Sequence, residues 1–167
     1  AHLIAQLAPK GSSFHACQCN WKAHRCARDD LAPRSRLINR DPENSYVNSG
    51  TYRMQLHDKN TLGLWMSPGQ NGRQICMKYW EKGKSCPVVA TYGQHPLVFM
   101  PSYTKFPYGS SEMEVSGGLI GKPLEVVLGP ITGLPIPASS EIAIEGEVPP
   151  PSEDARDEGP FGEWPGY

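Results

Sequence analysis

Residues 46–56 read Tyr46-Val47-Asn48-Ser49-Gly50-Thr51-Tyr52-Arg53-Met54-Gln55-Leu56, and β-prone residues dominate this stretch. The pattern predicts a strand, although polar and apolar residues alternate imperfectly. His57-Asp58-Lys59-Asn60 is typical of a hairpin turn, and Thr61–Met66 is expected to return as the second strand. Arg53 then lies on a hairpin strand, where one face of the sheet can present its side chain to a pocket.

One helix is expected after the hairpin, at residues 72–82. Ile75, Tyr79 and Trp80 give this segment an apolar face, and Gly83 is well placed to end it. The glycine-containing turn before it leaves backbone N–H groups free at the positive end of the helix dipole, where anions such as phosphate bind. An ordinary loop-to-helix turn is the commoner outcome of the same pattern.

Other short apolar runs predict further strands. These are Cys86–Tyr92, Leu97–Met100, Leu124–Leu128 and Ile142–Val148. A short helix is expected to begin near Glu112. Short strands, hairpin turns and one or two helices predict a mainly β protein built as a small antiparallel barrel, although the pattern alone does not separate a barrel from a sandwich.

Composition excludes several classes of protein. The 167 residues suit one domain with a core, and 17 Pro and 17 Gly disfavour a helical bundle. The net charge of −1 gives no basic surface for nucleic acid, and no apolar run approaches the length that spans a membrane. Residues 1–8 lack the pattern of a signal peptide, and five Cys form no regular disulfide framework. We therefore expect a cytoplasmic protein.

Two carboxylates stand five residues apart near the end of the chain, in Glu158-Gly159-Pro160-Phe161-Gly162-Glu163. Gly and Pro fix the path of such a turn, so the two acids hold defined positions. Carboxylates held close together repel, so one can keep a proton near neutral pH while the other stays charged, which suits acid–base work at carbon. An acidic turn near a terminus is also typical of plain solvated surface.

His15, Cys17, Cys19, His24 and Cys26 crowd into twelve residues near the N-terminus. Thiolates and imidazoles suit zinc, and a small zinc-stabilised interaction domain is one hypothesis for this segment. Cys17 and Cys19 lack the two-residue gap of common zinc knuckles, so ordinary buried thiols are the favoured interpretation.

Four blocks of sequence stand in a characteristic order. They are Asn48-Ser49-Gly50-Thr51-Tyr52-Arg53, Ser111-Glu112, the run Leu134-Pro135-Ile136-Pro137-Ala138-Ser139-Ser140-Glu141-Ile142-Ala143-Ile144-Glu145-Gly146, and Glu158–Glu163. Together they resemble the UbiD family of reversible decarboxylases over about residues 40–167, and GTYRMQ and EGPFGE are the most specific motifs. Family members are longer at both ends, so the chain resembles their central domain alone.

The resemblance implies a split β-barrel like that of flavin reductases, with prenylated flavin mononucleotide (prenylated FMN) as cofactor. It divides the chain into a segment without assigned structure at residues 1–36, a cofactor-binding barrel at 37–150 and a catalytic loop at 151–167 that leads to an absent C-terminal domain. The implied partners are a small aromatic or unsaturated carboxylic acid and CO2. A homo-oligomer, or association with further UbiD domains or subunits, is also implied.

Decarboxylation leaves an electron pair on carbon that side chains cannot accept, so an electron sink of the flavin kind is required. A carboxylic acid can then deliver a proton to that carbon, and a guanidinium is the natural partner of a carboxylate. The resemblance implies that Arg53 pairs with Glu158 and that Glu163 is the proton donor. Without the resemblance, Arg53 is interpreted as an ordinary ion-pair residue.

The resemblance also implies a divalent metal, usually manganese, and a potassium ion near the flavin phosphate. Asn48 and Glu112 match the family's metal ligands, and Glu114 is the alternative to Glu112. Many relatives carry a His where this chain has Asn71, a neutral and weaker oxygen donor, so an altered metal site is expected. The residues that match cofactor-binding positions are Asn48, Thr51, Tyr52, Arg53, Gln70 and Asn71.

The leading hypothesis is non-oxidative, reversible decarboxylation of an aromatic, heteroaromatic or α,β-unsaturated carboxylic acid. The alternative is a flavin-binding module or incomplete subunit without activity of its own, and Asn71 motivates it. Glu141 and Glu145 are interpreted as framework residues, because alternate strand residues at a sheet rim are most often structural. The choice of acid and the direction of the reaction stay open.

Overall fold

The computed structural model describes residues 2–7, 35–58 and 60–156 of the chain. Within these residues, strands dominate and the three α-helices are short. In chain order the elements are β1 His2–Leu7, β2 Ser35–Arg40, β3 Val47–Asp58, β4 Thr61–Trp65, α1 Asn71–Trp80, β5 Cys86–Tyr92, α2 Pro96–Phe99, the 3-10 helix η1 Met100–Tyr103, α3 Glu112–Ile120, β6 Val126–Leu128, β7 Pro135–Pro137, β8 Ile142–Val148 and β9 Ala155–Arg156.

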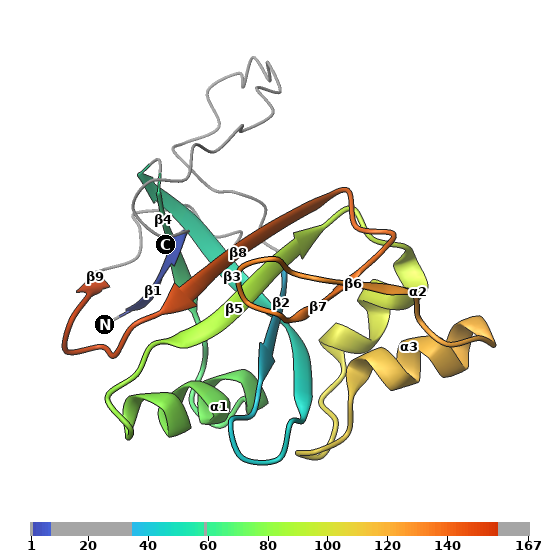
Figure 1. The fold of residues 1–167 in the computed structure, drawn as a ribbon, viewed down its shortest axis with the longest axis horizontal. Coiled ribbons are helices and arrows are strands. Elements are labelled where there is room, and N and C mark those ends of the chain that lie inside the picture. The colour runs from blue at the N-terminus through green and yellow to red at the C-terminus, as the bar shows by residue number, and fades with distance from the viewer. Residues whose placement is uncertain (1, 8–34, 59, 157–167) are drawn as a thin grey trace, which may run out of the picture.

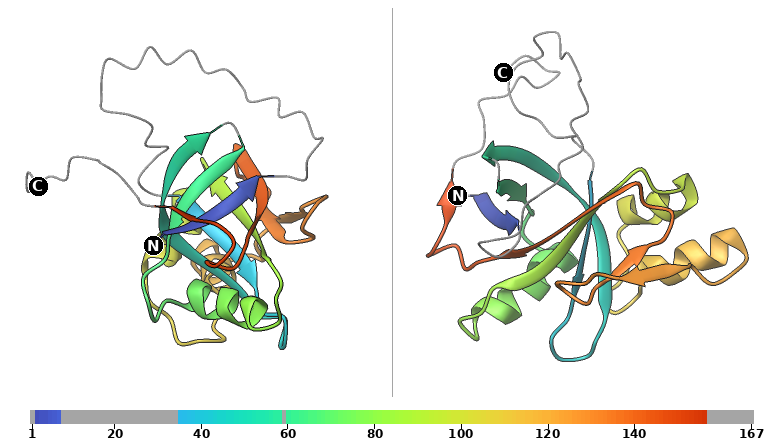
Figure 2. Two further views of the ribbon diagram at one scale, coloured as in Figure 1. Left: turned by 90° about the vertical axis from the view of Figure 1, so that its left-hand side faces the viewer. Right: turned by 45° about the horizontal axis from the view of Figure 1, so that its top comes forward.

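The strands form one curled antiparallel sheet in the order β4-β3-β2-β5-β8-β1-β9. Because β1 pairs with β4 as well as with β8, the sheet closes on itself through β1 (Figures 1 and 2). β6 and β7 form a separate two-stranded hairpin. The prediction of a mainly β, barrel-like fold is confirmed, whereas the division of the chain into three segments stays a prediction.

β2 lies inside this sheet, yet the sequence pattern does not predict it. The strand pairs with β3 on one side and with β5 on the other. Only Leu37 and Ile38 are apolar among its residues, so the run lacks the hydrophobic pattern of a buried strand. Its polar residues are buried nevertheless, and Arg36 and Asn39 have no exposed surface.

Most predicted elements are present. β3 and β4 form the expected hairpin, in which Arg53 lies opposite Trp65. α1 covers nearly all of the predicted helix, and Gly83, in the turn after it, has a φ of 64°, a conformation that favours glycine. β5 and β8 have the predicted bounds, and α3 begins where a short helix was expected.

The strand predicted at Leu97–Met100 is wrong. This segment forms α2 and the start of η1. Pro96 has the fixed φ that suits a helix start, and Nδ1 of His95 caps α2 by accepting from the N–H of Leu97 at 3.2 Å. Val98 alone in the run is buried, so a short helix with one buried side chain replaces the strand.

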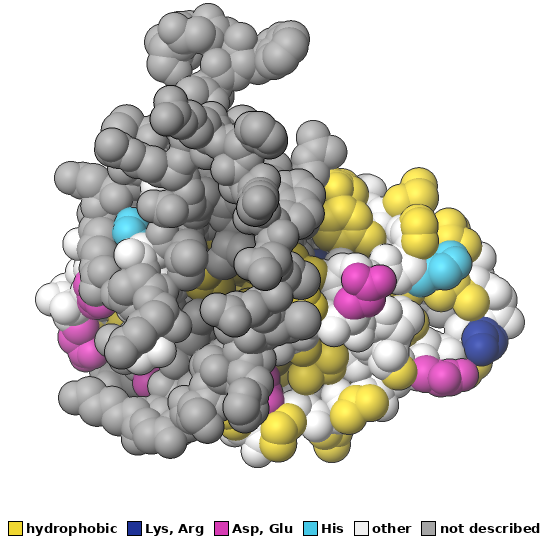
Figure 3. Space-filling model, turned by 90° about the horizontal axis from the view of Figure 1, so that it is seen from above, with side chains coloured by type: hydrophobic (Ala, Val, Ile, Leu, Met, Phe, Trp, Pro, Cys, Tyr) yellow, Lys and Arg dark blue, Asp and Glu magenta, His cyan; other side chains and the backbone are white. Residues whose placement is uncertain are grey.

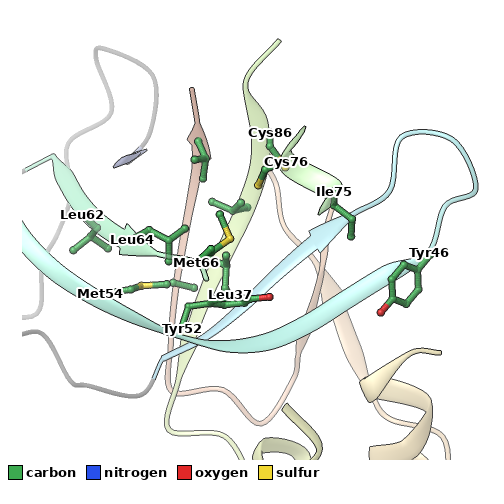
Figure 4. Packing of buried hydrophobic residues seen from close by; sticks show 13 residues of the cluster. Leu37, Tyr46, Tyr52, Met54, Leu62, Leu64, Met66, Ile75, Cys76 and Cys86 are labelled. Carbon is green, nitrogen blue, oxygen red and sulfur yellow. The ribbon is translucent and has the colours of Figure 1, made fainter. Parts of the chain in front are cut away.

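One face of the sheet, called here the α1 face, packs against α1 over the main hydrophobic core (Figure 4). Side chains alternate along a strand, so Leu37 points to this face and Ile38 to the other. The buried members of the core are Leu37, Tyr46, Tyr52, Met54, Leu62, Leu64, Met66, Ile75, Cys76, Cys86, Val88, Ala90 and Val148. Burial of this apolar surface is the main source of stability.

The opposite face, called here the α3 face, carries a smaller core shared with α3 and the β6–β7 hairpin. Its buried members are Ile38, Val89, Met113 and Leu134. Glu145 of β8 anchors the hairpin, because its carboxylate accepts from the N–H of Ile131 at 3.2 Å and from the N–H of Thr132 at 2.7 Å. These contacts agree with the framework interpretation of Glu145.

Hydrophobic side chains also reach the surface near α3 and the hairpin. Those at least partly open to solvent include Leu119, Val126, Val127, Leu128 and Ile131. Figure 3 shows hydrophobic side chains gathered on the side of the molecule where Figure 1 places α2 and α3. None of the helices that the structure describes is long and apolar enough to cross a membrane.

Candidate cofactor and metal site

A cavity of about 230 Å³ opens where β3, the start of α1, η1 with the loop after it, and the start of α3 meet. These segments lie far apart in the sequence, and the fold brings them together. Six of the residues that line the cavity are residues predicted to bind cofactor or metal: Asn48, Thr51, Tyr52, Gln70, Asn71 and Glu112. Their roles stay predictions, but their proximity is a property of the fold.

The predicted acid–base residues are less completely described. Arg53 is half-buried on β3 and lies two residues beyond Thr51 on the same side of the strand, but it does not line the cavity. Glu158 and Glu163 lie outside the described residues, as does the cluster from His15 to Cys26. The pairing of Arg53 with Glu158 therefore stays a prediction.

Asn48 is held by the strand beside it. Its side chain is 1 % exposed, and its Nδ2 donates to Oδ1 of Asn39, the opposite residue on β2, at 2.9 Å. Because this contact engages the amide nitrogen of Asn48 within the protein, the carbonyl oxygen is the atom that Asn48 can offer to a cation.

Asn71 is the first residue of α1. Its Nδ2 donates to the hydroxyl of Tyr46 at 3.4 Å and to the carbonyl of Phe106 at 3.3 Å. As with Asn48, the nitrogen is engaged and the oxygen is the atom available for a ligand. The first turn of α1 contains no acidic residue, and the side chain of the N-cap residue Gln70 accepts from the N–H of Ser67 at 3.1 Å without capping the helix. No acidic side chain of the first turn therefore offsets the positive end of the helix dipole beside the cavity.

The start of α1 approaches β3 closely at Gly72. The N–H of Gly72 donates to the hydroxyl of Tyr52 at 3.1 Å, and a Cβ at Gly72 would collide with that hydroxyl. Burial raises the pKa of Tyr52 to about 12, so the hydroxyl is neutral at physiological pH. Glycine at this position lets the helix start touch the strand that carries Asn48.

Glu112 begins α3 and is only 4 % exposed. Its carboxylate accepts from the N–H of Ser49 at 2.9 Å. Burial raises the pKa of Glu112, against backbone hydrogen bonds and the charge of Arg36. No ion pair among the described residues includes Glu112. Glu112 lines the cavity, whereas Glu114 lines a separate hollow, so Glu112 is the better placed of the two candidate ligands.

Arg36 is a charged residue near the site that sequence reasoning missed. Its Nε donates to the hydroxyl of Ser49, while Nη1 and Nη2 have no hydrogen-bond partner within the described residues. Burial lowers the pKa of Arg36 to about 10, against the effect of Glu112, so the guanidinium stays charged at neutral pH. Ser49 thus links a buried cation through its hydroxyl to a buried carboxylate through its N–H.

Sequence reasoning also missed Asn39, Ser102 and Lys105. The hydroxyls of Ser102 and Thr51 lie 2.7 Å apart, and Lys105 brings a positive charge to the cavity lining. No local pattern marks these residues, since each reaches the site only through strand pairing, through η1 or through the loop after it. One signal could have placed Asn39 at the site. Asn39 and Asn48 are spaced around a hairpin turn, so they can lie opposite each other on paired strands.

The residues present fit a hard divalent cation and a phosphate. Two amide oxygens and one carboxylate are ligands that such cations accept. Among the described residues, no three His, Cys, Asp or Glu side chains cluster to hold a metal, so a site here depends on the two amides together with Glu112. The cavity is smaller than pockets that enclose a whole drug-sized ligand, so it suits the phosphate end of a flavin.

Comparison with protein families gives one match over most of the chain. Residues 34–167 match the UbiD family, described as the 3-octaprenyl-4-hydroxybenzoate carboxy-lyase Rift-related domain. A phenolic acid decarboxylase from Streptomyces sp. (strain D7) is 34% identical over 135 residues, which are 78% of this chain and 28% of that protein. A phenolic acid decarboxylase from Escherichia coli O157:H7 is 34% identical over 128 residues, 76% of this chain and 26% of that protein.

Solved structures agree with the sequence matches. The evolved dimeric form of the UbiD-class enzyme HmfF from Pelotomaculum thermopropionicum, in complex with prenylated FMN, has a TM-score of 0.73 and 31% identity over 84% of this chain and 33% of that one. Vanillic acid decarboxylase from Sedimentibacter hydroxybenzoicus in closed form has a TM-score of 0.75 and 30% identity over 86% of this chain and 32% of that one. The chain thus spans about a third of these proteins or less.

Proposed function

The chain belongs to the UbiD family of carboxy-lyases, and from this premise we propose that it forms the cofactor-binding core of a non-oxidative, reversible decarboxylase. The proposed substrate is an aromatic, heteroaromatic or α,β-unsaturated carboxylic acid, which releases CO2. The observation that carries the proposal is the single cavity that collects Asn48, Asn71 and Glu112 from three separate segments. We place the protein in the cytoplasm, as a homo-oligomer or joined to further UbiD domains.

The proposed cofactor is prenylated FMN, which when bound supplies the electron sink for the pair released as the bond to CO2 breaks. Asn48, Asn71 and Glu112 hold a divalent cation such as Mn2+ at its phosphate, with K+ close by. The prenylated FMN bound in the HmfF relative supports this choice of cofactor. The remaining residues proposed to contact it are Thr51, Tyr52, Arg53 and Gln70.

The proposed acid–base residues are Arg53, Glu158 and Glu163. The guanidinium of Arg53 holds Glu158 in its charged form and orients the carboxylate of the substrate. Glu163, as a carboxylic acid, delivers the proton to the carbon that loses CO2. The position of Arg53 on β3, two residues beyond the cavity residue Thr51, supports its part in this arrangement.

The proton-donor role is tested with Glu163→Gln in protein loaded with prenylated FMN. We expect the flavin absorbance to be retained and CO2 release from a panel of phenolic, heteroaromatic and acrylic acids to be lost, because an amide cannot supply the proton. Glu153→Gln, at an exposed loop residue, is the matched control and should keep the wild-type rate. Full activity of Glu163→Gln would sink the assignment.

A flavin-binding module without activity of its own is the second candidate. One observation favours it: Asn71 offers a neutral ligand, which leaves Glu112 as the only acidic side chain among the described residues that line the cavity. Asn71→His separates the candidates. Gain of Mn2+ affinity and of CO2 release would identify an enzyme with a weakened metal site, whereas flavin binding without CO2 release in both proteins would identify a binding module.

A further inference from the structure

Asn39 is a buried polar residue that sits behind the candidate site. It lies on β2 between β3 and β5 and has no exposed surface. A buried amide costs stability unless its donors and its acceptor find partners, and an apolar side chain of similar size would pack in the same core without that cost. The presence of Asn at this position therefore calls for an explanation.

Both ends of the Asn39 amide contact segments that supply candidate metal ligands. Its Oδ1 accepts from Nδ2 of Asn48 at 2.9 Å, and its Nδ2 donates to the carbonyl of Gly72 at 3.0 Å. Gly72 directly follows Asn71 at the start of α1. One planar side chain thus joins β3, at the first amide ligand, to α1, beside the second.

The contacts leave one orientation for the Asn48 amide. Asn39 cannot reverse its own amide, because its nitrogen donates to the carbonyl of Gly72. A reversed Asn48 would then set its carbonyl oxygen against the oxygen of Asn39, an acceptor facing an acceptor. The contact to Gly72 also holds the first turn of α1, from which Asn71 donates to Tyr46 and to the loop before α3.

We propose that Asn39 is a positioning residue that orients Asn48 and Asn71 so that their carbonyl oxygens face a divalent cation. The proposal rests on the metal site of the proposed function and adds to it a residue that touches neither the cation nor the cofactor. Residues that orient metal ligands from behind commonly change metal affinity by ten- to a hundredfold when they are substituted, as order-of-magnitude values.

The test is a titration of Mn2+ alone into the flavin-free protein, with free Mn2+ read from its electron paramagnetic resonance signal. Asn39→Leu should bind Mn2+ about tenfold more weakly than the wild type, because the Asn48 amide can then reverse. Asn39→Gln keeps a neutral amide whose oxygen can accept from Asn48, so it should bind Mn2+ more tightly than Asn39→Leu. This partial rescue would not follow if Asn39 merely filled space in the core.

Cys76→Ala is the matched control. Sγ of Cys76 lies 3.7 Å from Nδ2 of Asn39, and its removal leaves the contact with Asn48 in place, so Mn2+ affinity should match the wild type. If Asn39→Leu fails to fold, Asn39→Ser, which is too short to reach Asn48, takes its place.

The outcomes separate the inference from the function on which it rests. Wild-type Mn2+ affinity in Asn39→Leu or Asn39→Ser would overturn the inference and leave the metal site standing. Absence of Mn2+ binding by the wild-type protein would refute the metal site of the proposed function and the inference with it.

Discussion

The α1 face and the α3 face of the sheet are both buried, but they handle polar groups differently, and β2 contributes to both. Leu37 and Asn39 point to the α1 face, whereas Arg36 and Ile38 point to the α3 face. On the α1 face, the oxygen and the nitrogen of the Asn39 amide both have partners. On the α3 face, Nη1 and Nη2 of Arg36 have no partner in the part of the chain that the structure describes.

The two faces therefore differ in how their buried polar groups affect stability. A face that serves stability can be packed with apolar side chains and paired amides, whereas a buried charged group whose hydrogen-bonding atoms lack partners costs stability. The candidate site lies where the two faces meet, with Asn48 on a strand of the barrel and Glu112 on α3. Under the proposed function, the α1 face positions the two candidate amide ligands and the α3 face supplies the candidate carboxylate.

The largest effect on stability is expected on the α1 face. Leu64, in the main core, is 1 % exposed, and Leu64→Ala should lower the free energy of unfolding by about 3 kcal/mol, because transfer energy is lost and a cavity is left. Urea denaturation measures this loss. The Mn2+ affinity of the folded protein should stay unchanged.

Val127→Ala on the exposed hairpin is the matched control, since Val127 is 59% exposed, and it should leave stability unchanged. An equal loss of stability in Val127→Ala, or a loss of Mn2+ affinity in Leu64→Ala, would contradict the expectation that the core on the α1 face sets stability without affecting metal binding.

A smaller loss is expected at Asp41, which ties α1 to the loop before α3. Its carboxylate accepts from Lys78 of α1 at 2.7 Å and from the hydroxyl of Tyr108. Burial of the carboxyl group raises the pKa of Asp41. The hydrogen bonds from Lys78, Tyr108 and the N–H of Glu43 outweigh this effect and hold the pKa below its ordinary value. Asp41→Asn should lower the free energy of unfolding by about 2 kcal/mol, since charge-assisted hydrogen bonds are lost.

The same carboxylate predicts a pH dependence of stability. Because the pKa of Asp41 is lower in the folded state than its unfolded value of 3.8, its contribution is present above that value and disappears as pH falls through the folded pKa. Urea denaturation at neutral pH and at about pH 3 should show a smaller acid-induced loss in Asp41→Asn than in the wild type. Equal losses would contradict the role of Asp41.

Removal of charge on the α3 face should not destabilise the protein. Burial raises the pKa of Glu112, so its ionisation costs stability above the folded pKa, and this cost disappears as pH falls through that pKa. The raised pKa already includes the attraction of Arg36, so Glu112→Gln should leave the metal-free protein at least as stable as the wild type. Scanning calorimetry checks this, and a marked drop in melting temperature would identify Glu112 as a structural residue instead.

The smallest effect is expected at Lys105, an exposed residue of the cavity lining. Exposed charge pairs contribute only a few tenths of a kcal/mol, so Lys105→Gln should weaken FMN binding about twofold and leave riboflavin, which lacks the phosphate, unaffected. Fluorescence titrations measure both affinities, and added salt should shrink the difference for FMN. Equal weakening of both flavins would place Lys105 away from the phosphate.

The sequence predicts those parts of the fold whose signals are local. The hairpin of β3 and β4 and the helix α1 carry β-prone runs, an apolar helical face and a terminating Gly83. The sequence pattern does not predict β2, because Arg36 and Asn39 stand where apolar residues normally mark a buried strand. The segment of α2 is predicted as a strand because four consecutive apolar residues show neither helical nor strand periodicity. Pro96, at the first position of α2, favours the start of a helix instead.

The sequence names several residues that the fold brings to one cavity, but not the residues that hold them in place or the lining residues Ser102 and Lys105. Resemblance to a family motif marks Asn48 and Glu112, yet their contacts come from residues that are distant or unremarkable in sequence. Arg36 reaches Ser49, and Asn39 reaches Asn48, only through the register between β2 and β3. Such register depends on the whole sheet, so no local pattern reports it.

The most direct test of the central claim is the affinity for FMN with and without Mn2+, in the wild type and in Glu112→Gln. The claim is that Asn48, Asn71 and Glu112 hold a divalent cation at the flavin phosphate. It predicts that Mn2+ strengthens FMN binding to the wild type, has no effect on riboflavin, and has no effect on either flavin in Glu112→Gln. Equal FMN affinity with and without Mn2+, or an undiminished gain in Glu112→Gln, would contradict it.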